Sequence, residues 1–151
     1  MATGPGLCMA ASAGDLDRCR ELLTEGAEVN AADVFKRTPL INAVVSGHAP
    51  VVQLLVAARA DTALADRSGW SALHWAAFQG DGDMVRLCLS LGADAKQKDL
   101  KGSTPREVVE HLLEGKGEAK FGEGLQGDRG LEAVLALLPS WPSREGSPVP
   151  K

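Results

Sequence analysis

The sequence predicts an all-α solenoid of stacked helix–turn–helix units with hairpin tips, and three observations predict this fold class. Residues of one type recur at an interval of 33 positions along most of the 151-residue chain. Helix-start signals stand at one place in the interval, and glycines stand where helices must end. Because one such unit cannot bury its apolar face alone, neighbouring units must stack.

The 33-residue period is carried by several residue types at once. Asp33, Asp66 and Asp99 share one register. The other recurrent sets are Gly14, Gly47 and Gly80; Leu7, Leu40 and Leu73; Ala10, Ala43 and Ala76; Ala27, Ala60 and Ala93; and Thr38, Ser71 and Thr104. Such agreement is not expected by chance, so the period defines the structural units.

Each unit shows the pattern of a turn followed by two helices. Thr38-Pro39 is typical of a helix start, because the hydroxyl accepts a hydrogen bond from a free N–H and Pro suits the first helical position. Gly47 falls where this first helix must stop. The apolar stripe at 51–55 predicts the second helix.

Four short segments carry the motifs that recur within these units. They are Thr38-Pro39-Leu40, Ser71-Ala72-Leu73-His74-Trp75-Ala76-Ala77, Gly26-Ala27-Glu28-Val29-Asn30-Ala31 and Gly92-Ala93-Asp94-Ala95. They resemble the ankyrin repeat, and the resemblance covers about residues 1–113. It implies that the first helices line a concave face and the second helices a convex one. It also implies that partner proteins bind the tips and the concave face.

The period divides the chain into four units and a tail. We expect an N-terminal capping repeat at 1–32, repeats at 33–65 and 66–98, an irregular C-terminal repeat at 99–138 and a disordered tail at 139–151. In the last repeat Arg106 replaces the expected Leu, and a Gly-rich insertion occupies about 114–127. The apolar run at 134–138 is interpreted as its displaced second helix, because the end of a solenoid must be covered. The alternative is an independent tail helix.

Aromatic and polar residues at the expected tips and concave face are the candidates for partner binding, since aromatic and Arg side chains are the usual anchors of interfaces. The candidates are Phe35, Arg37, Arg67, Trp70, Phe78, Gln79 and Lys101. Phe35, Trp70 and Phe78 are predicted to form an aromatic ridge. Alternatively, the first two fold onto neighbouring tips and Phe78 packs between helices. Trp75 is expected to pack inside the stack.

No set of residues indicates catalysis. The ankyrin resemblance implies that His74 ties neighbouring turns by hydrogen bonds. Cys8 falls at the equivalent place two repeats earlier, which is too far from His74 for a shared metal ion. No Ser/His/Asp set, phosphate loop or metal-ligand spacing is present in the sequence. We therefore expect no enzyme activity, no cofactor and no metal.

Asn30 is a candidate for covalent modification. Many ankyrin repeats are substrates of a cytosolic asparaginyl hydroxylase, and Leu22, Glu28 and Val29 match the residues that precede the Asn of its typical target. The resemblance therefore implies hydroxylation of Asn30. The alternative is that its side chain only satisfies backbone groups of the turn.

Composition and charge exclude other classes of function. The chain has 16 Lys and Arg against 20 Asp and Glu, which argues against a nonspecific nucleic-acid binder. No apolar run approaches the length of a membrane span, and no secretory or lipidation signal is evident. The scattered Cys8, Cys19 and Cys88 fit reduced thiols in the cytoplasm or nucleus.

The sequence therefore predicts a monomeric module for protein–protein interaction, acting as an adaptor, scaffold or regulator. Its partner is expected to be a protein, with no nucleic acid and no membrane involved. Two alternatives remain open. The length and repeat number resemble the four-repeat inhibitors of cyclin-dependent kinases, although the Gly-rich insertion departs from them. The chain could also be a structural subunit that assembles through the convex face or the tail helix.

Overall fold

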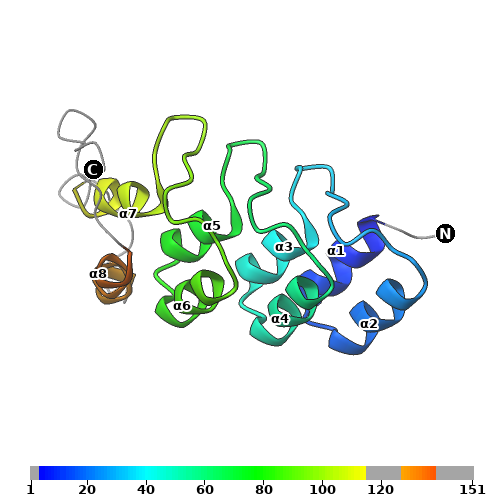
Figure 1. Ribbon diagram of the computed structural model, residues 1–151. Helices are drawn as coiled ribbons and strands as arrows, with labels where there is room; N and C mark the ends of the chain where they lie inside the picture. Colours follow the sequence, from blue (N-terminus) through cyan, green and yellow to red (C-terminus); the bar gives the residue numbers. More distant parts are fainter. Residues whose placement is uncertain (1–3, 115–126, 139–151) are drawn as a thin grey trace, which may run out of the picture.

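The computed structural model describes residues 4–114 and 127–138, and these form helices joined by turns, without strands. Helix pairs stack in one row, and long loops project from one edge of it (Figure 1). The helices are α1 (Gly4–Ala13), α2 (Leu16–Thr24), α3 (Pro39–Ser46), α4 (Ala49–Ala57), α5 (Ala72–Phe78), α6 (Gly82–Ser90), α7 (Pro105–Glu114) and α8 (Gly127–Leu137). The predicted all-α solenoid with projecting tips is confirmed.

After the first pair, the first helix of each pair begins directly after the predicted hydroxyl residue, Thr38, Ser71 or Thr104. Thr38 Oγ1 accepts a hydrogen bond from the Ile41 N–H at 3.1 Å and caps α3. In α7, Thr104 Oγ1 accepts from the Glu107 N–H at 3.2 Å, and Glu107 Oε1 accepts from the Thr104 N–H at 2.9 Å. This reciprocal pair is a capping box, which satisfies two N–H groups that the helix itself leaves free.

The core is a continuous apolar layer between the stacked helices. Leu7, Leu40 and Leu73, which share one register of the period, are all buried in it. Val52 and Val85 contribute to the same cluster from the second helices. Every unit thus buries the same face against its neighbour, which is why the period of the sequence becomes the period of the stack.

Helix α8 packs against α6 and α7 at the end of the stack. Val134 and Leu138 are buried there. Arg106 donates from Nη1 to the carbonyl oxygens of Leu135 and Leu138 at 2.8 and 2.7 Å. A cation at the C-terminal end of a helix satisfies carbonyls that have no partner within it. The residue that departs from the repeat pattern therefore fastens the last helix.

This packing supports the view that α8 is the second helix of the C-terminal repeat, and we propose that assignment over an independent tail helix. The linking residues 115–126, which make up most of the predicted Gly-rich insertion, lie outside the described part of the chain. The tail predicted at 139–151 lies outside it as well.

The first turn of α8 approaches the turn after α5 with no room for a side chain. A Cβ atom added at Gly130 would lie 2.4 Å from the Gly80 carbonyl oxygen. At Gly82, by contrast, an added Cβ would meet only Leu137 Cδ1, at 3.6 Å. The two glycines therefore make a matched pair for testing the docking of α8.

We expect Gly130→Ala to lower the free energy of unfolding by about 1–3 kcal/mol, as overpacking does, even though Ala favours helix more than Gly. Gly82→Ala is expected to change it by less than about 0.5 kcal/mol. Urea denaturation followed by circular dichroism measures both. Equal, small effects of the two substitutions would show that α8 does not dock against the Gly80 turn.

Candidate functional site

Each tip is held by an aspartate that accepts hydrogen bonds from two N–H groups of its own loop. Asp66 Oδ1 accepts from the backbone N–H of Ser68 at 2.9 Å and of Trp70 at 3.1 Å. Asp33 and Asp99 form the same pair of bonds, two and four residues further along. The aspartates that mark the period are thus the residues that shape the tips.

The tips also require a left-handed backbone at one position. Lys36, Gly69 and Gly102 share that register, with φ of 63°, 80° and 85°. Neighbouring tips touch each other, since the Leu100 N–H donates to the Ser68 carbonyl oxygen at 3.2 Å. We name the tips after their repeats, so that the second tip is 33–37, the third is 66–70 and the fourth is 99–103. The third and fourth tips therefore form one connected edge.

In two of the tip aspartates, Asp66 and Asp99, the second oxygen accepts a hydrogen bond from a tryptophan. Asp66 Oδ2 accepts from Trp75 Nε1 at 2.9 Å, and Asp99 Oδ2 accepts from Trp70 Nε1 at 2.9 Å. Burial alone would raise the pKa of Asp99, but the hydrogen bonds from Ser103, Trp70 and the Lys101 backbone outweigh it and hold the pKa below its ordinary value. This carboxylate is therefore charged and receives three N–H donors.

Three aromatic rings meet below the third tip and form what we call the aromatic cluster, Trp70, Trp75 and Phe78. The ring centroids of Trp70 lie 4.9 Å from Trp75 and 5.1 Å from Phe78, with tilted or edge-on geometry. Such pairs contribute about 0.5–1.5 kcal/mol each beyond their burial. Phe78 remains 40% exposed, whereas both tryptophans are half-buried.

Of the predicted ridge, the structure brings Trp70 and Phe78 into contact but keeps Phe35 apart on the second tip. Trp75, which was expected inside the stack, packs against the core with part of its surface and completes the aromatic cluster with the rest. Arg37 connects the two regions, because its guanidinium lies 4.8 Å from the Trp75 ring centroid and 5.8 Å from that of Phe35. Phe35 itself is 61% exposed.

Two further candidates link neighbouring units. Arg67 Nη2 donates to the Val34 carbonyl oxygen at 2.7 Å, and Gln79 Nε2 donates to the Val45 carbonyl oxygen at 2.7 Å. Both side chains therefore already form a hydrogen bond between neighbouring repeats. The Lys101 side chain is exposed, and its backbone N–H is bound to Asp99.

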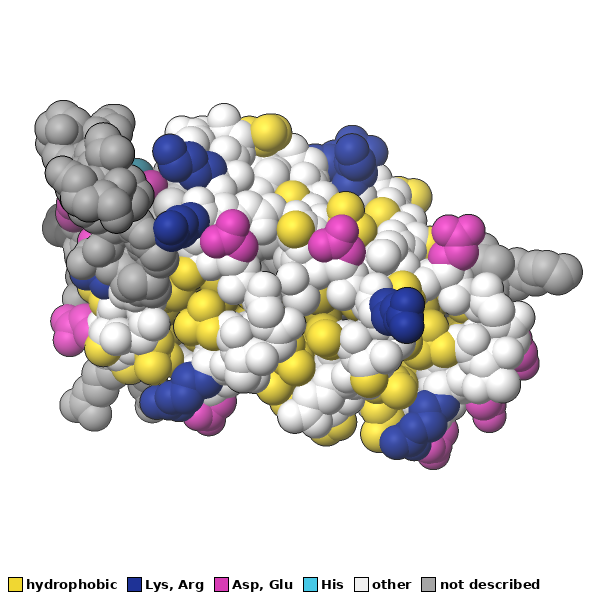
Figure 2. All heavy atoms as spheres, viewed as in Figure 1, with side chains coloured by type: hydrophobic (Ala, Val, Ile, Leu, Met, Phe, Trp, Pro, Cys, Tyr) yellow, Lys and Arg dark blue, Asp and Glu magenta, His cyan; other side chains and the backbone are white. Residues whose placement is uncertain are grey.

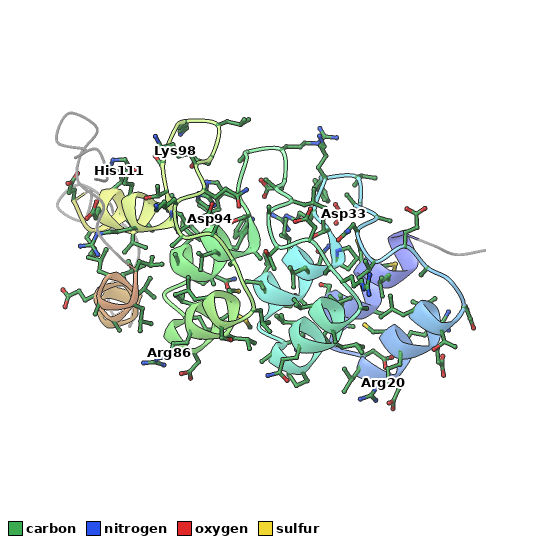
Figure 3. The ribbon with its side chains drawn as sticks, in the orientation of Figure 1. Arg20, Asp33, Arg86, Asp94, Lys98 and His111 are labelled. Carbon is green, nitrogen blue, oxygen red and sulfur yellow. The ribbon has the colours of Figure 1, made fainter. Side chains whose placement is uncertain are left out.

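A pocket of about 340 Å³ opens between the third tip, the fourth tip and α7. Figure 3 shows His111 on α7 and Lys98 on the segment that leads to the fourth tip, both at this end of the stack. The pocket is lined by Ser68, Trp70, Phe78, Asp99, Lys101, Ser103, Val108, His111 and Leu112. Three of the predicted candidates thus share one pocket. Val108 and Asp99 were not predicted to line it, and only their place in the period could have indicated this.

His74 ties neighbouring turns, as predicted. Its Nε2 lies 2.9 Å from the Ser103 carbonyl oxygen, and its Nδ1 accepts from the Ser71 N–H at 3.2 Å. The carbonyl oxygen can only accept, so Nε2 carries a proton. Nδ1 carries none, because it accepts from the Ser71 N–H, and the ring is therefore neutral. Cys8, two periods earlier, makes an equivalent contact through its thiol, which donates to the Arg37 carbonyl oxygen at 3.5 Å.

The three thiols are buried and free of disulfides. Burial, followed by the nearby Asp33, raises the pKa of Cys8 to about 11, and burial, followed by Asp81, raises that of Cys88 to about 12. The described residues contain no group of three or more His, Cys, Asp or Glu side chains that could hold a metal ion. None of the described helices is long and apolar enough to cross a membrane.

Asn30 lies half-buried in the turn after α2. Its Oδ1 accepts a hydrogen bond from the Asp61 N–H at 2.9 Å, so the side chain joins the first unit to the second. This contact is what the structural alternative for Asn30 requires. Hydroxylation of Asn30 stays a prediction, to be tested by peptide mass analysis after co-expression with the hydroxylase.

Comparison with known proteins identifies the family. A model of ankyrin repeats in three copies matches residues 7–99, and the chain therefore belongs to the ankyrin-repeat family. Ankyrin repeat and SAM domain-containing protein 6 of Mus musculus is 35% identical over 107 residues, covering 70% of this chain and 12% of that protein. Inversin of Gallus gallus is 37% identical over 101 residues, covering 66% of this chain and 9% of that protein.

A shorter relative, Notch-regulated ankyrin repeat-containing protein B of Danio rerio, is 49% identical over 57 residues, covering 38% of this chain and 51% of that protein. This chain thus spans about a tenth of the two longer relatives and half of the shorter one. The likeness concerns the repeats. Ankyrin repeats generally mediate interactions between proteins and are typically not enzymes.

The buried His74 makes stability depend on pH in a defined window. Burial lowers its pKa below the ordinary value of 6.5, against the opposing effect of the Ser103 hydrogen bond. Just below pH 6.5 the unfolded chain therefore binds more protons than the folded chain. The contribution of neutral His74 to stability is complete above that pH and is lost as the pH falls through its lowered pKa. The lowered pKa of Asp99 affects stability only near or below pH 3.8, the ordinary pKa of this group.

We expect the free energy of unfolding to fall between about pH 7 and pH 5, and we expect His74→Gln to flatten this dependence while lowering stability at pH 7. Urea titrations at several pH values measure both quantities. A His74→Gln variant that keeps the wild-type slope would show that another group is responsible.

Proposed function

We propose that this chain is a protein–protein interaction module that holds a partner against its tips and the concave face of α3, α5 and α7. The observation that carries the proposal is the aromatic cluster, which stays partly exposed beside a pocket of about 340 Å³. Exposed aromatic side chains at the edge of a pocket are the usual anchors of protein interfaces. In this role the chain acts as an adaptor, scaffold or regulator.

The distribution of exposed apolar side chains supports this surface over the convex one. Six large apolar side chains are exposed in the described part of the chain, and they are Met9, Val34, Phe35, Leu64, Phe78 and Leu100. Four of them, Val34, Phe35, Phe78 and Leu100, lie on the tips or in the groove below them. Apolar groups that cluster on one edge favour a docking surface there. The alternative of a subunit assembling through its convex helices lacks such support.

The candidates differ in how free they are to bind. Trp70 and Trp75 have their indole N–H groups bound to aspartates, so their substitution is expected to disturb the tips as well as any interface. Phe35 and Phe78 have no such bond, and Lys101 has an exposed side chain. Phe35, Phe78 and Lys101 are therefore the better probes of binding, although Trp70 is the more central residue.

The compartment and the oligomeric state are part of the same proposal. Three buried thiols with raised pKa values, free of disulfides, suit a reducing compartment, and we place the protein in the cytoplasm or nucleus as a monomer. The alternative of a kinase inhibitor depends on length and repeat number alone. Recovery of a cyclin-dependent kinase among the captured partners would support this alternative.

The test is affinity capture with the full chain, quantified by mass spectrometry. We expect Phe78→Ser and Phe35→Ser each to reduce recovery of the specific partner about tenfold, which corresponds to about 1.4 kcal/mol. Arg86→Ser on α6 is the control, because Arg86 is exposed on a second helix and pairs with Asp83 of its own helix.

Leu73→Ala serves as a reference for a variant that loses binding because it unfolds. Removing this buried side chain is expected to lower the free energy of unfolding by about 2–5 kcal/mol. Thermal melts separate loss of binding from loss of fold in each variant. Partners recovered equally by wild type, Phe35→Ser and Phe78→Ser would place the binding surface elsewhere and refute the proposed function.

A further inference from the structure

The tips turn their negative charges inward and their positive charges outward. Asp33, Asp66 and Asp99 each direct Oδ1 to two N–H groups of their own loop. The tip cations are Lys36, Arg37, Arg67 and Lys101, of which all but Arg37 are exposed. The tip edge is therefore basic, although the whole chain carries a formal net charge of -4.

Three exposed acids of the repeats form a separate row. Glu28, Asp61 and Asp94 share one register and lie in the segments that lead from the second helices to the next tip. Figure 2 shows acidic side chains in a row below the basic ones of the tip edge, and Figure 3 labels Asp94 among them. Glu28, Asp61 and Asp94 thus lie in one row and the exposed tip cations in another, and of the two rows only Lys101 lines the pocket.

The pocket combines apolar walls with a basic rim. Trp70, Phe78, Val108 and Leu112 supply the apolar walls, and Lys101 with His111 supplies the cationic or hydrogen-bonding groups. Among the described residues that line the pocket the one acid is Asp99, whose oxygens already receive three N–H donors. An incoming carboxylate would therefore meet Lys101 rather than an unscreened negative charge.

We propose that the partner presents an extended acidic segment, with one large apolar side chain that enters this pocket and with carboxylates that lie along the tip cations. This inference rests on the proposed function and specifies the chemistry of its partner. A volume of about 340 Å³ is near the lower end of the range of about 300–1,000 Å³ for ligand pockets, which suits a side chain rather than a folded surface. The neighbouring Val34, Phe35 and Leu100 give the segment apolar contacts between the charges.

The experiment uses the full chain as bait for a random twelve-residue peptide library displayed on phage. We expect enriched peptides to carry two or more Asp or Glu around one large apolar residue. Fluorescence anisotropy then measures the dissociation constant of the most enriched peptide, made synthetically. We expect Lys101→Glu to weaken binding about tenfold and Arg86→Glu, the same charge reversal on α6, to weaken it less than about twofold.

Salt and nucleic acid supply two further arms. Because the contacts are at exposed charges, raising the salt concentration from about 50 to 300 mM should weaken peptide binding several-fold. A 20-base-pair DNA duplex should bind far more weakly than the peptide. Duplex binding that matches the peptide and is lost in Lys101→Glu would assign the basic edge to nucleic acid and overturn the inference.

The remaining outcomes separate this inference from the proposed function. Enrichment of neutral or basic peptides whose binding is lost in Phe78→Ser would refute the acidic partner but leave groove binding intact. Enrichment of no peptide, or equal weakening by Lys101→Glu and Arg86→Glu, would also refute it. The proposed function itself fails only if the groove substitutions leave captured protein partners bound.

Discussion

The hydrogen bonds of the tip aspartates connect every part of the surface that could hold a partner. In each tip one oxygen fixes two backbone N–H groups of the loop, and in the third and fourth tips the other fixes a tryptophan. Removal of the Asp99 carboxylate would leave the buried Ser103 N–H without its partner, at a cost of about 1–3 kcal/mol. Loop shape, ring orientation and the outward direction of Lys101 therefore depend on the same group.

The core explains why such bonds can form at regular intervals. Leu40 and Leu73 bury the same face in successive units, so the tips emerge at a constant spacing and each can reach the next. His74 and Cys8 make the same link between units with different chemistry, an imidazole at 2.9 Å and a thiol at 3.5 Å. The period thus preserves the geometry of a contact even where the residue type changes.

The period alone was sufficient to predict the helices, their caps and the projecting tips, because these depend on local signals such as Thr38 and Gly47. It could not reveal that Trp75 joins Trp70 and Phe78, since that contact depends on ring orientation set by two aspartates. The period also could not reveal that Arg106, which departs from the repeat pattern, donates hydrogen bonds to carbonyl oxygens at the end of α8. The reason is that α7 and α8 lie apart in the sequence. The charge segregation of the tips was hidden for a similar reason: only the structure shows which carboxylates face their own backbone.

Native-state hydrogen exchange of the Asp99→Ala variant measures whether the aspartates hold the tip edge in a defined shape. The account predicts that the backbone N–H of Ser103 and the indole N–H of Trp70, both bound to Asp99, exchange far faster than in the wild type. Amides in the middle of α3 should keep their protection. Unchanged slow exchange at Ser103 and Trp70 would contradict the account.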